Sequence, residues 1–209
     1  GASMVTVKKN GIPADFKYVA VIESGLVNVV SPAGAKGIWQ FMPDTAKEIG
    51  LEVNENIDER YHLEKATEAA CVYFLKAKEK FGNWTLVAAA YNAGGTGVKK
   101  QMDTQRVTNY YDLLLNDETS RYVFRILALK QIMEHPEQYG FPIAEEEQYR
   151  IVATKKIVID SSVTDLASLA IQQGINYKIL KIHNPWLRTT KMLNPTNKKY
   201  QLEIPLEGY

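Results

Sequence analysis

Residues 16–26 have the sequence Phe-Lys-Tyr-Val-Ala-Val-Ile-Glu-Ser-Gly-Leu. Apolar side chains occupy nearly every position, and this predicts a short helix that is buried on most of its surface. Lys17 and Glu23 are its only charged residues. Glu23 follows Val19 by four positions and Phe16 by seven, so it lies on the same helix face as these apolar residues.

The location of Glu23 on an apolar face has a chemical consequence. Burial disfavours the charged form of a carboxyl group and raises its pKa. A carboxyl group of this kind keeps its proton near neutral pH and can donate it as a general acid. The alternative is a glutamate at a frayed helix end that pairs with a surface lysine. Periodicity alone leaves both interpretations open.

A loop of small residues follows this helix. Residues 31–37 are Ser-Pro-Ala-Gly-Ala-Lys-Gly, and they lead into Ile-Trp-Gln-Phe-Met-Pro at 38–43. Bulky apolar residues after such a loop can form the wall of a groove, and the amide of Gln40 has two donors and an acceptor for a polar ligand such as a sugar. The alternative is an ordinary core-forming turn in which Gln40 satisfies backbone groups.

Composition narrows the class of protein. Apolar residues make up 45% and charged residues 23% of the 209 residues, which is typical of a folded chain and excludes global disorder. The net charge of +1 argues against nucleic-acid binding through bulk charge. No apolar run approaches the ~18 residues of a membrane-spanning helix. The first residues lack a signal-peptide pattern, which fits a cytoplasmic protein or a mature form.

Cysteine and histidine content argues against two kinds of site. A single cysteine, Cys71, excludes an intramolecular disulfide, and its apolar surroundings predict a buried thiol. The three histidines are far apart in the sequence and never at i, i+4. We therefore expect no histidine-built metal centre.

The pattern of apolar residues predicts a mainly helical first part and a mixed second part. The predicted helices cover residues 16–26, 43–50, 63–81, 84–92 and 119–134, with a helical turn at 109–115. An acidic run at 145–147 separates this part from the tail. The tail is predicted as strand 150–159, helices 163–173 and 177–183, and strand 200–205, in the order β-α-α-β.

Four motifs in a fixed order point to a known family. They are Glu23-Ser24-Gly25, then Ser-Pro-x-Gly-Ala-x-Gly-Ile-Trp-Gln-Phe-Met-Pro at 31–43, then Ala-Tyr-Asn-Ala-Gly at 90–94, then Glu118-Thr119-x-x-Tyr122. This series, over about residues 13–140, resembles the lytic murein transglycosylases with a lysozyme-like (SLT) domain. The resemblance implies a mainly α fold class, with a lysozyme-like helical catalytic domain at 1–145.

The resemblance also implies a role for each matching residue. Glu23 resembles the catalytic acid and base of the family. The remaining positions resemble residues that bind the glycan: Ser31 and Gln40 hold the sugar at the cleavage point, Tyr91 and Asn92 line the groove, and Glu118 and Tyr122 complete its floor.

Each of these residues also has a structural interpretation. Asn92 with Gly94 fits a helix C-cap, and Tyr91 fits a core position. Glu118 in a first helical turn is favoured by the helix dipole, and Tyr122 at i+4 can pair with it. Asp58 and Arg60 match a family pattern as well, and we interpret them as a structural salt bridge.

The tail has a resemblance of its own. Thr164-x-Leu-Ala-x-Leu-Ala170, Gly174, Asn184-Pro185 and Leu202-x-Ile-Pro205 resemble a LysM module, which implies that residues 146–209 bind glycans containing N-acetylglucosamine. An extra run at about 186–199 separates Asn184-Pro185 from the last strand. The alternative is a β-α-α-β domain that only braces the catalytic domain.

Together the resemblances imply a peptidoglycan lytic transglycosylase. The expected reaction cleaves the β-1,4 bond between N-acetylmuramic acid and N-acetylglucosamine and leaves a 1,6-anhydromuramoyl end, with no metal or organic cofactor. The expected partners are peptidoglycan glycan strands and no nucleic acid. The protein is expected to be a monomer in the periplasm or cell envelope, with a lipid anchor to the outer membrane outside this chain. A goose-type lysozyme-like hydrolase and a non-catalytic wall-binding protein are the alternatives.

Overall fold

The computed structural model describes residue 7, residues 10–141 and residues 152–207. Contacts divide the chain into two compact units. We call Gly1–Val27 with Thr67–Ile143 the helical unit, and Asn28–Ala66 with Ala144–Tyr209 the mixed unit. The domain boundary predicted between residues 145 and 146, and the acidic run beside it, lie outside the described residues.

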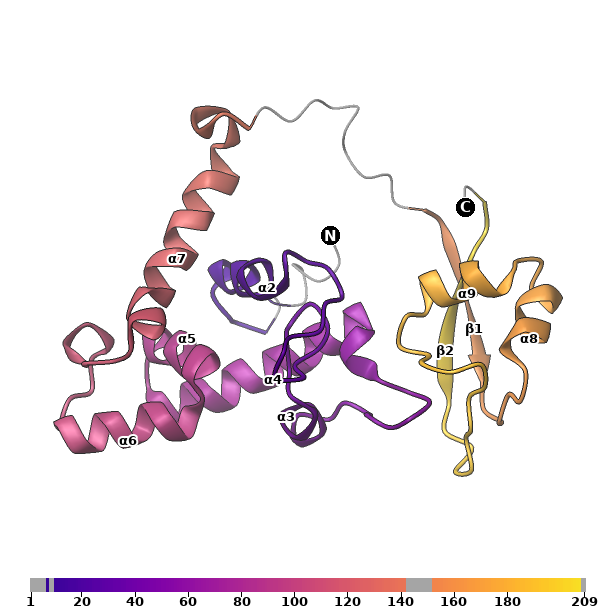
Figure 1. Cartoon of the computed structure of the whole chain (residues 1–209), viewed down its shortest axis with the longest axis horizontal. Helices are drawn as coiled ribbons and strands as arrows, with labels where there is room; N and C mark the ends of the chain where they lie inside the picture. Colours follow the sequence, from indigo (N-terminus) through magenta and orange to yellow (C-terminus); the bar gives the residue numbers. More distant parts are fainter. Residues whose placement is uncertain (1–6, 8–9, 142–151, 208–209) are drawn as a thin grey trace. The chain divides into compact units, whose positions relative to one another are not determined.

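Helices dominate the first part of the chain (Figure 1). α2 packs against α7, and α5 packs against both α6 and α7. The elements of the helical unit are the 3₁₀ turns η1 (Ala14–Phe16), η3 (Tyr110–Asp112) and η4 (Pro136–Tyr139), and helices α2 (Lys17–Ser24), α5 (Trp84–Ala93), α6 (Gly95–Gln105) and α7 (Asp117–Glu134). α4 (Leu63–Phe81) contributes its residues from Thr67 onward.

Aromatic packing forms the core of the helical unit. The ring of Phe16 lies edge-on to Phe74 and Trp84, at centroid distances of 4.7 and 5.2 Å. Val19 on α2 and Leu86 on α5 are completely buried in the same unit. Edge-to-face pairs are a favoured geometry for buried rings. The apolar face predicted for residues 16–26 is therefore part of the core.

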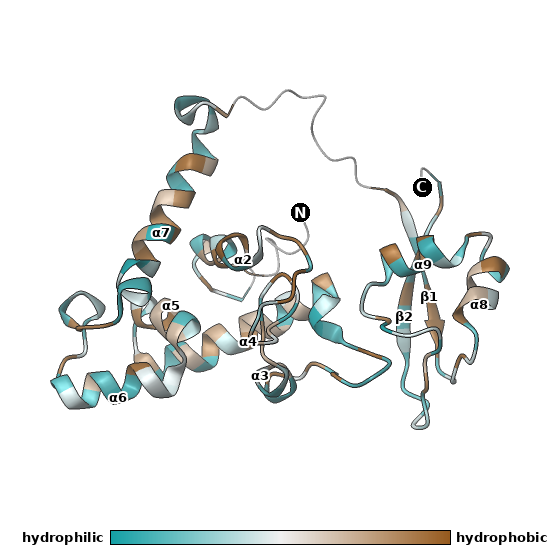
Figure 2. Cartoon of the chain, in the orientation of Figure 1, coloured by the Kyte–Doolittle hydropathy of each residue, from teal (hydrophilic) through white to brown (hydrophobic). Residues whose placement is uncertain are grey.

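Helix α6 is absent from the sequence-based prediction. Gly94 ends α5 with φ of 84°, as predicted, but a new helix begins at the next residue. Figure 2 shows why the pattern is weak, because α6 is coloured mostly teal and white. Val98 is the residue of α6 that the interior buries. A helix with one buried side chain has no apolar stripe from which to predict it.

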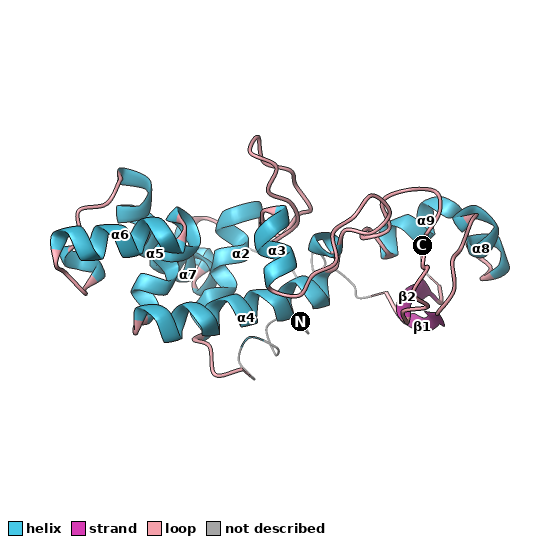
Figure 3. Ribbon diagram, turned by 90° about the horizontal axis from the view of Figure 1, so that it is seen from below, coloured by secondary structure: helices cyan, strands magenta, loops and turns pink. Residues whose placement is uncertain are grey.

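The mixed unit contains α3 (Pro43–Glu48), η2 (Glu59–Tyr61) and the tail elements β1 (Thr154–Ile159), α8 (Leu166–Gln172), α9 (Tyr177–His183) and β2 (Tyr200–Pro205). The two strands are antiparallel, with Thr154 opposite Pro205 and Ile159 opposite Tyr200. In Figure 3 α8 and α9 lie on one side of the strands. The predicted β-α-α-β order is confirmed, and so is the mainly α fold class.

Two boundaries in the tail differ from the prediction. α8 begins at Leu166 and not at Val163, because the carboxylate of Asp165 accepts hydrogen bonds from the backbone N–H groups of Ala167 and Ser168 and caps the helix. The first strand begins at Thr154, while residues 150 and 151 lie outside the described residues. Among the residues described, no helix has both the length and the apolar character needed to span a membrane.

Candidate active site

Glu23 is positioned by the contact between α2 and α7. It lies in the last turn of α2 and is half-buried. Its Oε1 accepts a hydrogen bond of 2.6 Å from the phenol of Tyr122, a fully buried residue of α7. Within the ranges that the structure describes, the partner of Glu23 is thus a buried phenol and not a surface lysine.

The surroundings of Glu23 raise its pKa. Burial raises it most, the hydrogen bond from Tyr122 lowers it, the negative charge of Glu118 raises it and the positive charge of Arg125 lowers it. Burial and the neighbouring negative charge of Glu23 also raise the pKa of Tyr122, so this phenol remains a donor. A carboxyl group with a raised pKa and a fixed donor is suited to transfer a proton.

The chain turns sharply directly after Glu23. Gly25 ends α2 with φ of 62°, and Leu26 has φ of 63°. The hydroxyl of Ser24 supports this turn, since it donates to the carbonyl of Ala20 and accepts from the N–H of Leu26. A leucine in the left-handed region is strained, and such residues cluster at functional sites.

Asn92 connects the end of α5 to the start of α7. Its Nδ2 donates to Oε1 of Glu118 at 3.0 Å, and its Oδ1 accepts from the hydroxyl of Thr119 at 2.8 Å. Gly94 caps α5, as the structural interpretation of Asn92 with Gly94 proposed, while the side chain of Asn92 bonds residues of α7. Glu118 bonds Asn92 and Tyr122 bonds Glu23, so the pairing of Glu118 with Tyr122 is wrong.

Tyr91 is half-buried in an aromatic cluster. Its ring centroid lies 5.2 Å from that of Tyr73 and 5.3 Å from that of Phe74. Burial raises the pKa of Tyr91 well above its usual range, and the charge of Glu23 adds to this effect. The residue therefore combines packing in the core with a location near the carboxyl group of Glu23.

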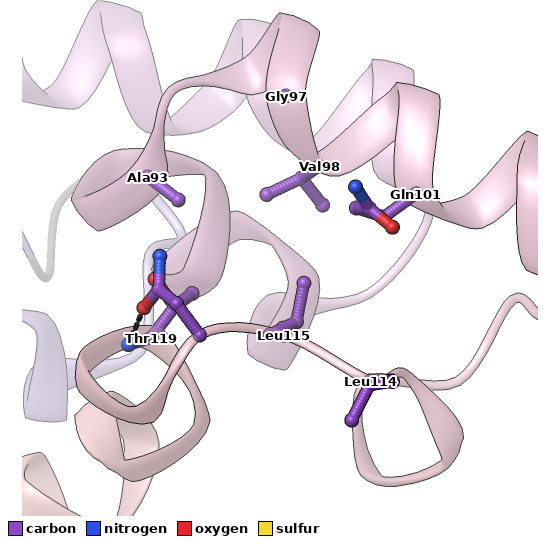
Figure 4. Close-up of a pocket in the computed structure, with 8 residues that line it drawn as sticks. Ala93, Gly97, Val98, Gln101, Leu114, Leu115 and Thr119 are labelled. Carbon is purple, nitrogen blue, oxygen red and sulfur yellow. Dashed lines mark hydrogen bonds between the residues drawn. The ribbon is translucent and has the colours of Figure 1, made fainter.

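Sequence analysis missed a cavity next to Thr119. The cavity has a volume of about 270 Å³ and is shown in Figure 4, where Val98 and Gln101 of α6 face Leu114 and Leu115. Its lining also includes Ala93, Gly97, Asn116 and Thr119. One wall comes from α6, so no prediction without this helix can find the cavity. Among the lining residues, Thr119 belongs to the motif that begins at Glu118, and this motif is the sequence signal closest to the cavity.

Ser31 and Gln40 lie on the small-residue loop of the mixed unit. The hydroxyl of Ser31 accepts from the N–H of Ala35 at 3.0 Å. The side-chain Nε2 of Gln40 donates to the carbonyls of Val29 at 3.0 Å and Gly37 at 2.7 Å. Gln40 thus satisfies backbone groups, as the alternative interpretation proposed, and its Oε1 is the atom left to face a ligand.

The predicted groove wall is mostly interior. Trp39 and Phe41 are only 3% and 4% exposed, whereas Met42 is 42% exposed. The expectation of an apolar groove wall is therefore wrong for Trp39 and Phe41. Burial is the usual state of such large apolar side chains.

Asp58 and Arg60 form the predicted salt bridge. The guanidinium Nε and Nη2 donate to the two carboxylate oxygens at 2.9 and 2.7 Å, and both side chains are buried. Nη1 of Arg60 also donates to the carbonyls of Phe41 at 3.1 Å and Gly34 at 3.4 Å. A two-pronged Arg–carboxylate bond of this kind fixes orientation as well as charge.

Two regions of the chain match known protein families. Residues 3–113 match the family model described as the Transglycosylase SLT domain. The chain belongs to this SLT family. Residues 155–208 match a second model, described as the Soluble lytic transglycosylase C-terminal LysM-like domain. The two resemblances predicted from the motifs are therefore confirmed.

Two relatives of this SLT chain are named as lytic murein transglycosylases. The chain is 32% identical over 184 residues to "Membrane-bound lytic murein transglycosylase D" of Escherichia coli K12, and equally to the protein of that name from Escherichia coli O6:H1. The match covers 85% of this chain, which spans 40% of the length of these relatives. An inactive mutant of the lytic transglycosylase Slt from Pseudomonas aeruginosa aligns with a TM-score of 0.49 and 20% identity, over 71% of this chain and 26% of that one.

In the part of the chain that the structure describes, no group of three or more His, Cys, Asp or Glu residues is arranged to hold a metal ion. Cys71 is buried, as predicted, and burial raises the pKa of its thiol.

Proposed function

We propose that this SLT-family chain is a peptidoglycan lytic transglycosylase. It cleaves the β-1,4 bond between N-acetylmuramic acid and N-acetylglucosamine and leaves a 1,6-anhydromuramoyl end. The observation that carries the proposal is the half-buried carboxyl group of Glu23, which has a raised pKa and accepts a 2.6 Å hydrogen bond from Tyr122. The match to the SLT domain and the name of the relatives support the same activity.

The proposed reaction uses Glu23 twice. Protonated Glu23 donates its proton to the glycosidic oxygen as the bond from this oxygen to the muramoyl C1 breaks. The Glu23 carboxylate then takes the proton of the muramoyl 6-hydroxyl, whose oxygen bonds to C1 and closes the anhydro ring. No water is consumed, and Glu23 ends in its protonated form. The 6-hydroxyl is tethered to the reacting carbon, so its effective concentration is high.

Tyr122 stabilises the ionised form of Glu23 between the two steps. Its phenol donates to Oε1 of Glu23, and a bond to the charged form of a carboxyl group favours that form. Burial favours the protonated form that the first step requires. These two influences on the pKa of Glu23 oppose one another, which suits an acid that becomes a base.

We propose that the remaining predicted residues bind the glycan. Gln40 offers Oε1 as an acceptor, because its Nε2 donates to two backbone carbonyls. Ser31 accepts from the N–H of Ala35, so its own hydroxyl hydrogen can be donated to the sugar. Tyr91, Asn92 and Glu118 line the groove, with Asn92 and Glu118 ordered by their mutual hydrogen bond.

Product analysis tests the proposal against a hydrolase. Hydrolases use two carboxyl groups, and Glu118 is the carboxylate whose charge affects Glu23. The proposal predicts that purified peptidoglycan yields muropeptides lighter by one water than hydrolysis products and resistant to borohydride. Reducible muramic acid ends would identify a goose-type hydrolase. An unchanged substrate with bound protein would identify a non-catalytic wall-binding protein.

The remaining proposals concern organisation and location. We propose a catalytic domain at 1–145 and a glycan-binding module at 146–209, because the LysM-like match covers residues 155–208. We also propose a monomer in the periplasm or cell envelope, attached through a lipid anchor outside this chain, since the proposed substrate lies there. Size-exclusion chromatography and cell fractionation of the full-length protein test these two points.

A further inference from the structure

The extra run of the tail makes backbone bonds to a distant part of the chain. We call residues 186–199 the insertion and residues 52–61 the docking segment. Ile57 and Leu187 form an antiparallel β-bridge. The N–H of Asp58 donates to the carbonyl of Trp186 at 2.9 Å, and the N–H of Arg188 donates to the carbonyl of Asn56 at 2.8 Å. The insertion and the docking segment thus pair like two short strands.

The docking segment also supplies part of the tail's hydrophobic core. Ile57 is completely buried and Tyr61 is 6% exposed, in one cluster with Leu166, Leu180, Leu187 and the strand residues of the tail. The guanidinium of Arg188 lies 4.0 Å from the centre of the Tyr61 ring. A core shared in this way joins the two segments into one cooperative structure.

Polar contacts surround this shared core. The side chain of Asn56 accepts from the N–H of Leu193 at 3.1 Å. Glu52 accepts from Lys198 at 2.7 Å and from the phenol of Tyr200 at 2.9 Å. Burial by itself would raise the pKa of Glu52, but these hydrogen bonds lower it, so Glu52 is a well-partnered carboxylate. The contact therefore has the buried apolar centre and polar rim of a stable interface.

The opposite side of the docking segment supports the small-residue loop. Arg60 donates to the carbonyls of Phe41 and Gly34. Its backbone lies so close to Gly37 that a Cβ at this glycine would be 2.0 Å from the Arg60 carbonyl oxygen. Gly37 also has φ of 80°, so both this backbone conformation and the close approach of Arg60 require glycine here. The loop that carries Ser31 and Gln40 thus rests directly on Arg60.

We propose that the C-terminal domain is a positioning element for the loop of Ser31 and Gln40, acting through the insertion and the docking segment. The role of the two residues in sugar binding rests on the proposed function. The physical reason is entropic, because a loop of small residues loses much freedom on ordering. A loop that is already ordered binds its ligand at a lower cost. Arg60 is the positioning residue that connects the two contacts.

The proposal separates binding from proton transfer. Glu23 lies in the helical unit, and so do Tyr122, Glu118 and Arg125, whose hydrogen bond and charges shift its pKa. Weakening the contact between insertion and docking segment should therefore raise KM and leave the pH dependence of kcat unchanged. A tail that only adds stability to the fold predicts an unchanged KM.

Asn56→Ala is the test variant, with Asn176→Ala as its matched control. Both substitutions remove one side-chain hydrogen bond to a backbone N–H of the tail, to Leu193 and to Ile179 respectively. Asn176 caps α9 and its bond stays within the tail. Hydrogen exchange of the full chain without substrate is measured at the N–H groups of Ala35, Lys36 and Gly37, which bond within the loop.

The expected result is faster exchange at these three amides in Asn56→Ala and wild-type exchange in Asn176→Ala. With short soluble glycan strands, Asn56→Ala should raise KM by about 2- to 30-fold, the range of such couplings. Equal loop exchange in both variants would overturn the proposal, and so would an unchanged KM. The exchange measurement needs no activity, so a failure of the proposed enzymatic function would be recognised separately. If Asn56→Ala unfolds, Arg188→Ala, which removes the contact with Tyr61, replaces it.

Discussion

Glu23 and Asp58 are two carboxyl groups removed from water in different ways. Glu23 accepts a hydrogen bond from Tyr122, and burial raises its pKa. Asp58 accepts from the backbone N–H, Nε and Nη2 of Arg60, and both side chains of this pair are nearly inaccessible. A buried carboxylate that is fully paired with a cation and hydrogen-bond donors has a structural role, whereas one that is only partly paired can change its protonation state.

This difference predicts opposite responses to neutral substitutions. Removing the charge at Glu23 should abolish chemistry and leave the fold intact. Removing the charge at Arg60 should weaken the fold first. Four predictions test this contrast.

Glu23→Gln should reduce peptidoglycan cleavage by at least about 10²–10⁴-fold, the usual contribution of general acid–base catalysis. Glutamine keeps the shape and can still accept the bond from Tyr122, but it has no proton to transfer. Product release from purified peptidoglycan is measured, with circular dichroism as the control for folding. More than about a tenth of wild-type turnover would show that Glu23 is not the acid.

Arg60→Gln should destabilise the chain by about 3–5 kcal/mol, because it leaves the buried charge of Asp58 without its partner. Lys99→Gln is the matched control, since it removes the exposed ion pair with Asp103, and surface pairs contribute no more than about 1 kcal/mol. Denaturant unfolding measures both variants. A loss for Arg60→Gln no larger than that of the control would contradict the assignment of Asp58–Arg60 as a buried structural pair.

Tyr122→Phe should reduce cleavage by about 10- to 100-fold, since hydrogen bonds to charged groups are worth about 1.5–3 kcal/mol. The bond from Tyr122 lowers the pKa of Glu23, so its loss should raise that pKa and move the alkaline limb of the kcat profile to higher pH. Tyr111 is an exposed tyrosine, and Tyr111→Phe is therefore the control. A limb that moves to lower pH would contradict the role of this hydrogen bond.

Glu23→Gln should also change how stability depends on pH. The raised pKa means that the folded state binds more protons than the unfolded state, so wild-type stability falls as pH rises through the window between the ordinary and the raised pKa. Glutamine does not titrate, so Glu23→Gln lacks this pH-dependent loss of stability. It should be more stable above the window, within the range of about 0.5–2 kcal/mol of single stabilising substitutions. Thermal unfolding at several pH values measures this, and a difference that grows toward low pH would have the wrong sign.

Local sequence signals predicted most of the secondary structure. The helix at 63–81 and the elements at 177–183 and 200–205 match the observed bounds. Asn83 and Asn116 cap α5 and α7 through their side-chain oxygens. These features depend on apolar periodicity and on capping by the nearest residues, and both are visible in a short window of sequence.

The partners of the site residues were not predictable in the same way. Spacing placed Tyr122 within reach of Glu118, yet Tyr122 bonds Glu23 and Glu118 bonds Asn92. Residues at i and i+4 share a helix face, but packing decides which of them turns inward. Contact with α2 buries Tyr122 completely, while Glu118 stays exposed. The motifs identified the residues, and the packing of α2, α5 and α7 decided which residues they contact.

By itself the sequence determined the family, the candidate acid and the β-α-α-β order of the tail, because these depend on residue identity and local pattern. Three other features depend on the fold: Glu23 is half-buried and accepts from the phenol of Tyr122, the side-chain nitrogen of Gln40 donates to the carbonyl of Gly37, and Ile57 packs in the core of the tail. Ile57 and Leu187 are far apart in the sequence, and no local pattern pairs them. Desolvation and long-range packing are properties of the folded chain, since they depend on which distant atoms replace water.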